Sequence, residues 1–74
     1  MAGIELLRRF ENYLIRGKYR PGDRIPGEQE LATHFGVSRG TMREAIACCV
    51  SRGLLERRTS RGTVLRLPTP EEIA

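Results

Sequence analysis

The stretch FGVSRGTMREA, residues 35–45, decides the fold of this chain. Gly36 is the kind of residue that ends a helix in a left-handed conformation, and Ser38 is a good N-cap for a following helix. The stretch therefore predicts two helices joined by the short turn Gly-Val-Ser. Arg39 and Arg43 stand at the start of the second of these helices, four residues apart, and this spacing places them on one helix face.

Two helices are expected on the N-terminal side of the turn. Apolar residues recur every three or four positions over residues 3–16, at Ile4, Leu7, Phe10 and Leu14. This spacing predicts an amphipathic helix that stops at Gly17. The next helix begins after Gly27 and carries carboxylates in its first turn, where the helix dipole favours them. Its apolar side consists of Leu31, Ala32 and Phe35.

On the C-terminal side, a third helix is expected over residues 39–52. Its core side consists of Met42, Ala45, Ile46 and Cys49. Beyond Gly53, residues 54–58 and 63–67 predict the two strands of a β-hairpin around a loop at residues 59–62. A very short strand or extended linker is expected at residues 24–26, because Pro26 favours an extended residue before it.

This order of elements predicts a mainly α fold with a small β-hairpin, the three-helix winged helix-turn-helix. Residues 1–66 are expected to form this one domain, with the third helix at about 39–52 and the hairpin, or wing, at about 55–66. Residues 67–74 carry two prolines and two glutamates. We expect them to form a linker or a disordered tail.

Length and composition exclude several classes of protein. A chain of 74 residues forms one small domain without room for a deep enzyme pocket. No carboxylate pair comes with a histidine or nucleophile in an arrangement typical of an active site, and no metal-ligand spacing occurs, so neither an enzyme nor a cofactor is expected. Cys48 and Cys49 point about 100° apart on a helix and cannot bridge each other, which fits a reducing cytosol.

A membrane location is also excluded at this stage. The uncharged apolar stretch AIACCVS, between Glu44 and Arg52, has seven residues, and a helix that spans a bilayer needs about 20. The sequence starts without a signal-peptide pattern. We therefore expect a cytoplasmic protein that does not bind membranes.

Positive charge is concentrated in residues 39–66, which carry seven arginines and two glutamates. Residues 1–38 carry six basic and five acidic residues, and the whole chain has a formal net charge of +4. A basic segment beside a balanced one is typical of a surface that binds a polyanion such as nucleic acid. The alternative is a solvated surface that only keeps the protein soluble.

The start of the third helix is the candidate reading surface. In a helix-turn-helix, the N-terminal residues of the second helix contact base edges in the major groove. Arg39 and Arg43 would there reach O6 and N7 of guanine, and each bidentate contact discriminates by about 1–3 kcal/mol. This outweighs the roughly 0.3–1 kcal/mol that a cation costs at a helix start. The hydroxyls of Ser38 and Thr41 can bind phosphate oxygens, and Gly40 lets the backbone approach the bases.

Other interpretations of the basic residues stay open. Both arginines of the third helix can be solvated, or they can pair with Glu44 or with a carboxylate of the second helix. Arg57, Arg58 and Arg61 in the hairpin are candidate DNA contacts, Arg61 before the other two, but charge on an exposed strand also protects against edge-to-edge pairing.

The chain resembles the DNA-binding domain of the GntR family of bacterial transcription factors over about residues 4–66. The family pattern contains G-x-x-x-P-G-x-x-L-P-S-E, then G-V-S-R, and R-G-T-x-V in the hairpin. The matching residues here are Gly17, Pro21, Gly22, Pro26, Glu28, Leu31, Ala32, Gly36, Val37, Ser38, Arg39, Arg43, Ala45, Gly53, Leu54, Gly62 and Thr63. Gly27 departs from the pattern, because serine is usual at that position.

The resemblance implies a homodimeric regulator that binds a near-palindromic double-stranded DNA operator. The contacts to bases and phosphates that the family makes from this helix would fall on Arg39, Gly40, Thr41 and Arg43. The wing tip, which in this family can enter the minor groove, corresponds to Arg61 and Gly62. Gln29 stands where the family often has a DNA-contacting arginine, and glutamine can still bond an adenine or a phosphate.

Family members normally continue into a ligand-binding and dimerising domain or an aminotransferase-like domain, whereas this sequence ends at Ala74. We therefore expect an excised N-terminal domain that is monomeric alone and dimeric in the full-length protein; an unusually short natural protein is the alternative. Two other function classes stay open. One is a winged helix that binds protein, and the other is a module that binds DNA or RNA without sequence preference.

Overall fold

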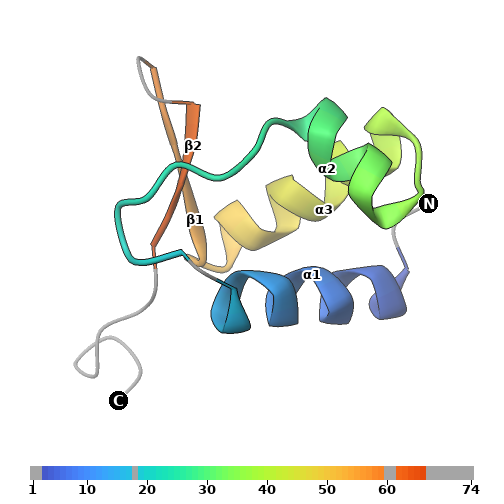
Figure 1. Cartoon of the computed structure of the whole chain (residues 1–74), viewed down its shortest axis with the longest axis horizontal. Coiled ribbons are helices and arrows are strands. Elements are labelled where there is room, and N and C mark those ends of the chain that lie inside the picture. The colour runs from blue at the N-terminus through green and yellow to red at the C-terminus, as the bar shows by residue number, and fades with distance from the viewer. Residues whose placement is uncertain (1–2, 18, 60–61, 67–74) are drawn as a thin grey trace.

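The computed structural model describes residues 3–17, 19–59 and 62–66, and these form three helices followed by an antiparallel hairpin (Figure 1). The elements are α1 (Ile4–Arg16), α2 (Glu28–Phe35), α3 (Arg39–Ser51), β1 (Leu55–Arg58) and β2 (Gly62–Leu65). The predicted mainly α fold with a small hairpin is therefore confirmed. The tail predicted at residues 67–74 lies outside the described residues.

The turn between α2 and α3 has the predicted chemistry. Gly36 has φ 70° and ψ 35°, a left-handed conformation in which its amide donates to carbonyls of the last turn of α2. Ser38 is the N-cap of α3, and its hydroxyl oxygen accepts from the amide of Thr41 at 3.1 Å. The glycine ends one helix and the serine begins the next, so the turn fixes the angle between α2 and α3.

The core forms where α3 packs against α1, α2 and β1, and Figure 1 shows α3 running between the other two helices to the hairpin. The fully buried side chains of this core include Phe10, Leu14, Leu31, Met42, Cys49, Leu55 and Leu65. The core side predicted for α3 is confirmed, because all four of its residues are buried. Cys49 lies in the core and Cys48 is half-buried, also as expected.

The predicted apolar stripe of α1 is wrong at one end. Leu6, Phe10 and Leu14 form the buried stripe, whereas Ile4 is 76% exposed and Leu7 is only partly buried. Side chains that are two residues apart on a helix point about 200° away from each other. Because Leu6 points into the core, Ile4 points toward solvent. Because Leu6 and Leu7 are adjacent, either leucine can continue the apolar stripe that contains Phe10 and Leu14. The prediction placed Leu7 in the stripe, whereas the structure buries Leu6.

The segment between α1 and α2 runs beside the hairpin. Arg24 pairs with Val64 as an isolated antiparallel bridge, the amide of Ile25 donates to the carbonyl of Thr63 at 3.0 Å, and the Ile25 side chain is buried. The short strand expected at residues 24–26 is thus one bridge against β2. This contact holds the wing against the segment that leads into α2.

The hairpin strands are slightly shorter than predicted, with the register running from Leu55 opposite Leu65 to Arg58 opposite Gly62. After β2, the amide of Arg66 donates to the carbonyl of Leu54 at 2.8 Å. The described chain therefore leaves the domain beside the C-terminal end of α3, at the opposite end of that helix from Arg39.

Candidate nucleic-acid interface

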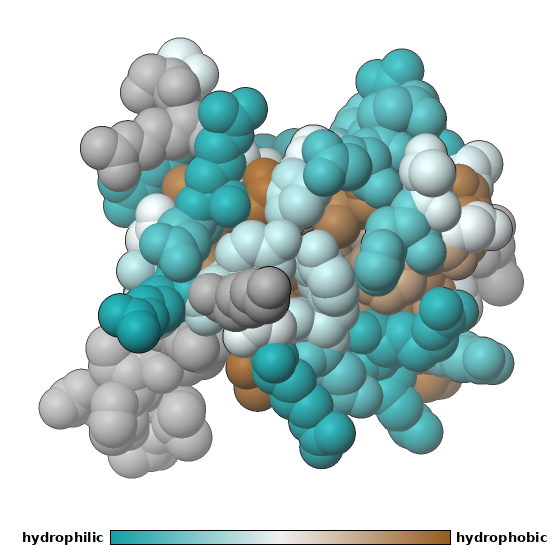
Figure 2. All heavy atoms as spheres, in the orientation of Figure 1, coloured by the Kyte–Doolittle hydropathy of each residue, from teal (hydrophilic) through white to brown (hydrophobic). Residues whose placement is uncertain are grey.

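The start of α3 is an exposed, basic helix end. The side chains of Arg39 and Arg43 are 58% and 61% exposed, and the first turn of α3 contains no acidic residue. Ser38 and Gly40 are exposed and Thr41 is half-buried. Gln29 is exposed on α2, the helix on the other side of the turn. The face shown in Figure 2 is covered mainly by hydrophilic residues, with hydrophobic atoms visible between them.

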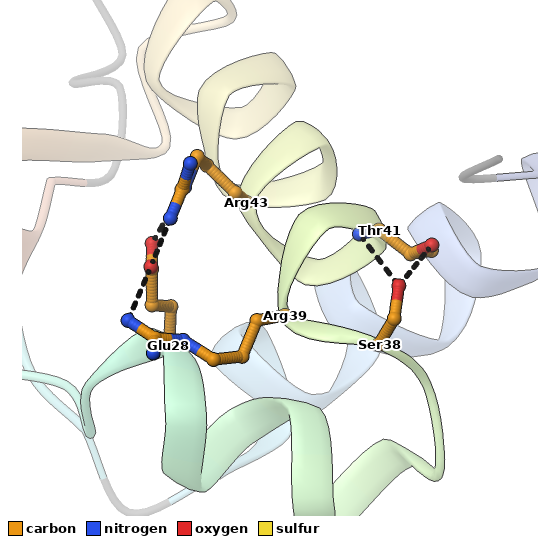
Figure 3. A network of polar contacts seen from close by, with 5 residues as sticks. All are labelled: Glu28, Ser38, Arg39, Thr41 and Arg43. Atoms are coloured by element: carbon orange, nitrogen blue, oxygen red, sulfur yellow. Dashed lines mark hydrogen bonds and ion pairs between the residues drawn. The ribbon is translucent and has the colours of Figure 1, made fainter.

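A single carboxylate of α2 holds both arginines (Figure 3). Arg43 donates from Nε to Oε2 of Glu28 at 3.3 Å and from Nη2 to Oε1 at 2.8 Å. Arg39 donates from Nη2 to the same Oε1 at 3.2 Å. The free protein therefore shows one of the alternatives stated above, in which the arginines pair with a carboxylate of the second helix. Because both guanidiniums stay more than half exposed, they remain accessible to a ligand.

Electrostatics keep this cluster ionised. The hydrogen bond from Arg43 lowers the pKa of Glu28 below its ordinary value of 4.5, with a further contribution from Arg39. The same bond raises the pKa of Arg43. At neutral pH the three side chains therefore carry one negative and two positive charges, and the cluster keeps a net positive charge at the helix start.

The two hydroxyls at this end of α3 are bonded to each other. The Ser38 hydroxyl donates to Oγ1 of Thr41 at 2.8 Å while it accepts from the Thr41 amide (Figure 3). The Ser38 proton is thus used within the cap. The Thr41 hydroxyl keeps its own proton for an outside acceptor such as a phosphate oxygen.

The wing supplies fewer described candidates than the sequence suggested. Arg58 donates to Glu56 on the same strand at 3.3 Å and is exposed. Gly62 is exposed, with φ 72°, at the first position of β2. Arg61 lies outside the described residues.

The fold brings three further residues close to this surface. The sequence allowed a carboxylate of the second helix as a partner of the arginines without singling out Glu28, Arg57 was weighed as a hairpin contact, and Arg24 was not among the candidate contacts. A cavity of about 120 Å³ between the segment before α2, the start of α2, α3 and the hairpin is lined in part by all three. Both arginines are exposed. Pairing of the linker with β2 is what places Arg24 here, and no local motif marks that pairing.

The described residues contain no cluster of histidine, cysteine and acidic residues that could hold a metal ion. Burial raises the pKa of the Cys49 thiol to about 12, so it is not a nucleophile at neutral pH. Within the described ranges, no helix has the length and apolar character to cross a bilayer.

The chain matches the model of bacterial regulatory proteins of the gntR family over residues 5–65. The chain is 34% identical over 68 residues to the HTH-type transcriptional repressor NagR of Bacillus subtilis (strain 168), covering 92% of this chain and 28% of that protein. It is 32% identical to the arabinose metabolism transcriptional repressor of Geobacillus stearothermophilus, covering 93% of this chain and 19% of that protein. The chain thus spans less than a third of the length of these relatives.

Solved structures show the same similarity. The DNA-binding domain of AraR in complex with operator ORR3 is 39% identical, with a TM-score of 0.71 over 82% of this chain and 74% of that one. A Streptococcus agalactiae GntR structure is 28% identical, with a TM-score of 0.77 over 92% of this chain and 34% of that one. The arrangement of three helices and a hairpin is therefore the winged helix-turn-helix of these proteins.

Proposed function

Because the chain belongs to the GntR family of bacterial regulatory proteins, we propose that it is the DNA-binding part of a transcriptional regulator and binds double-stranded operator DNA sequence-specifically. Residues 1–66 are the DNA-binding domain in this proposal, and residues 67–74 are a linker or a disordered tail. The relatives reported above are named as transcriptional repressors, which favours a regulator over an enzyme. A cytoplasmic location follows from this role, since the operator is there.

One observation carries the proposal: two exposed arginines stand side by side at the open start of α3, directly after a helix-turn-helix turn. In this geometry the start of α3 enters the major groove, where the backbone amides and the helix dipole attract phosphate. Arg39 and Arg43 then read guanine edges. The operator complexes of the AraR domain support DNA as the partner.

The surrounding residues position the domain on the duplex. Thr41 and Ser38 lie at the same helix end, and Gln29 lies on the neighbouring helix, where their polar groups can reach phosphates or bases. Gly40 keeps the surface between the arginines free of a side chain. The wing, with Arg58, Arg61 and Gly62, contacts DNA beside the major-groove site of α3.

The full-length protein is proposed to be a homodimer on a palindromic site, while the isolated chain is a monomer. The matched relatives are several times longer than this chain, which leaves room for a dimerising part. Two linked domains gain affinity through effective concentration, by roughly 10²–10⁴-fold.

The test is selection of bound sequences from a random duplex library at about 0.15 M salt, an ionic strength at which weak surface attraction is screened. The wild-type chain is compared with Arg39→Ala/Arg43→Ala. Arg8→Ala/Arg16→Ala is the charge-matched control, because these two arginines are exposed on α1. We expect a short recurring half-site for the wild type and the control, and none for the α3 variant.

Other outcomes would contradict the proposal. Binding of all duplexes without enrichment would favour the non-specific module, and no binding at all would favour a protein partner. The same half-site in the α3 variant would show that sequence is read elsewhere. A variant of Arg43 alone that weakens all duplexes equally would make that residue a phosphate contact.

A further inference from the structure

We propose that Glu28 is a positioning residue that determines the sequence discrimination of α3. Its carboxylate orients the guanidinium of Arg43 for base reading and at the same time reduces attraction to phosphates. The inference rests on the proposed function, because it concerns how the same helix distinguishes one duplex from another.

The hydrogen bonds to Glu28 leave free the edge of the Arg43 guanidinium that is formed by Nη1 and Nη2. A guanidinium has five N–H donors in one plane. Glu28 takes the Nε proton and one Nη2 proton, which lie together on one edge. The second Nη2 proton and both Nη1 protons remain, and two parallel donors are enough for O6 and N7 of guanine. One carboxylate can therefore fix the plane of the group without competing for the base.

Glu28 is itself held in place, which makes it a useful support. It is the first residue of α2, where the helix dipole favours a carboxylate, and its side chain is only 24% exposed. The turn through Gly36 and Ser38 fixes α2 relative to α3. An arginine tied to this point loses less rotamer freedom on binding than a free one, so less affinity is lost to ordering it.

The negative charge of Glu28 also favours discrimination between duplexes. Without it, Arg39 and Arg43 present two uncompensated charges on flexible side chains, and these can contact phosphates of any sequence. Each additional phosphate contact steepens the dependence of log K on log salt by about 0.9 in B-DNA. Removing the carboxylate therefore strengthens binding to any duplex while it weakens the preference for the right one.

The experiment measures dissociation constants at several salt concentrations for the selected half-site and for a scrambled duplex of equal length. The variant is Glu28→Gln, which keeps the shape and removes the charge. Glu30→Gln is the matched control, because Glu30 lies in the same first turn, is exposed and does not bond either arginine. Thermal unfolding of both variants checks that the fold is kept.

For Glu28→Gln we expect tighter binding of the scrambled duplex, a steeper salt slope, and a ratio of specific to non-specific affinity reduced by up to roughly 5- to 150-fold, the range of one bidentate contact. Glu30→Gln should change both duplexes by the same factor. In an Arg43→Ala background, Glu28→Gln should change the ratio much less, because the residue through which it acts is gone.

Two results separate the inference from the proposed function. A wild-type chain that does not distinguish the two duplexes overturns the proposed function. A wild-type chain that does distinguish them, together with a Glu28→Gln variant that keeps the same ratio or behaves like Glu30→Gln, overturns the role of Glu28 alone. An undiminished effect of Glu28→Gln in the Arg43→Ala background would likewise show that Glu28 does not act through Arg43.

Discussion

At Gly40, the stability of a helix and close contact with a ligand make opposite demands. Gly40 is the second residue of α3 and is exposed, and a β-carbon built there meets no atom within 4 Å. We predict that Gly40→Ala stabilises the free protein by up to about 1 kcal/mol, because alanine is the better helix former. We also predict weaker DNA binding, since the methyl group would stand between the two arginines and the groove.

Denaturant unfolding and a binding titration on the same preparations check both parts of this prediction. Ala47→Gly is a control for the effect of helix propensity on the free energy of unfolding, because Ala47 is an exposed position further along α3. It should lose stability by a similar amount and bind DNA with nearly unchanged affinity. An alanine at position 40 that leaves the affinity intact would show that the backbone stays away from the bases.

Single residues were predicted well where the rule is local and poorly where it is not. The left-handed Gly36, the Ser38 cap and the shared face of Arg39 and Arg43 all follow from spacing of four residues or fewer, and the structure confirms the first two directly. The partner of the arginines was anticipated only as an alternative, a carboxylate of the second helix, and the particular residue was not identified. Glu28 is 11 and 15 residues away from them, and its approach depends on how α2 crosses α3.

At the scale of an element, the N-cap Ser38 stabilises the start of α3, where Arg39 and Arg43 lie. We predict that Ser38→Ala lowers the free energy of unfolding by about 1 kcal/mol, within the range of 0.5–2 kcal/mol seen for lost caps. The physical reason is the Thr41 amide, which loses its acceptor at 3.1 Å. Chemical denaturation measures the loss.

Ser38→Asp is the informative companion to that variant, because a carboxylate also caps a helix. It should retain most of the stability and still weaken DNA binding, since it places a negative charge at the end of α3 that we propose lies against phosphates. Equal stability of the wild type and Ser38→Ala would mean that water replaces the cap at no cost.

Among the elements, helices were the easier part to predict. The cap residues predicted the bounds of α2 and α3 nearly to the residue, and the apolar periodicity predicted α1 with one error at Ile4. The hairpin was predicted from its strand composition, but the bridge between Arg24 and Val64 joins segments 40 residues apart. Nothing in either segment specifies that pairing, so Arg24 was missed as a neighbour of the candidate interface.

At the scale of the whole molecule, affinity is expected to depend on the number of linked domains. We predict that joining two copies of the chain through a C-terminal dimeric coiled coil tightens binding to a palindromic operator by roughly 10²–10⁴-fold. The reason is that the second half-site is then bound intramolecularly. Titration of the single and the joined protein against the same duplex measures the gain.

A duplex with one half-site is the control, because it offers the second domain nothing specific to bind. The joined protein should gain little on it beyond the factor of two in binding sites. An equal gain on both duplexes would show that added charge, and not a second specific contact, causes the tighter binding. No gain on the palindrome would contradict a dimeric mode of operator recognition.

The contact between Arg66 and Leu54 has a consequence for how such a domain can be reused. It places the exit of the described chain at the far end of α3, about 20 Å along a helix of 13 residues from Arg39. A segment that continues from there reaches the end of α3 that carries Arg39 only by folding back over the domain. A gene fusion can therefore exchange the attached segment without a change in the residues of the proposed DNA-binding surface. The domain can thus be joined to different partner domains, in natural recombination and in synthetic circuits.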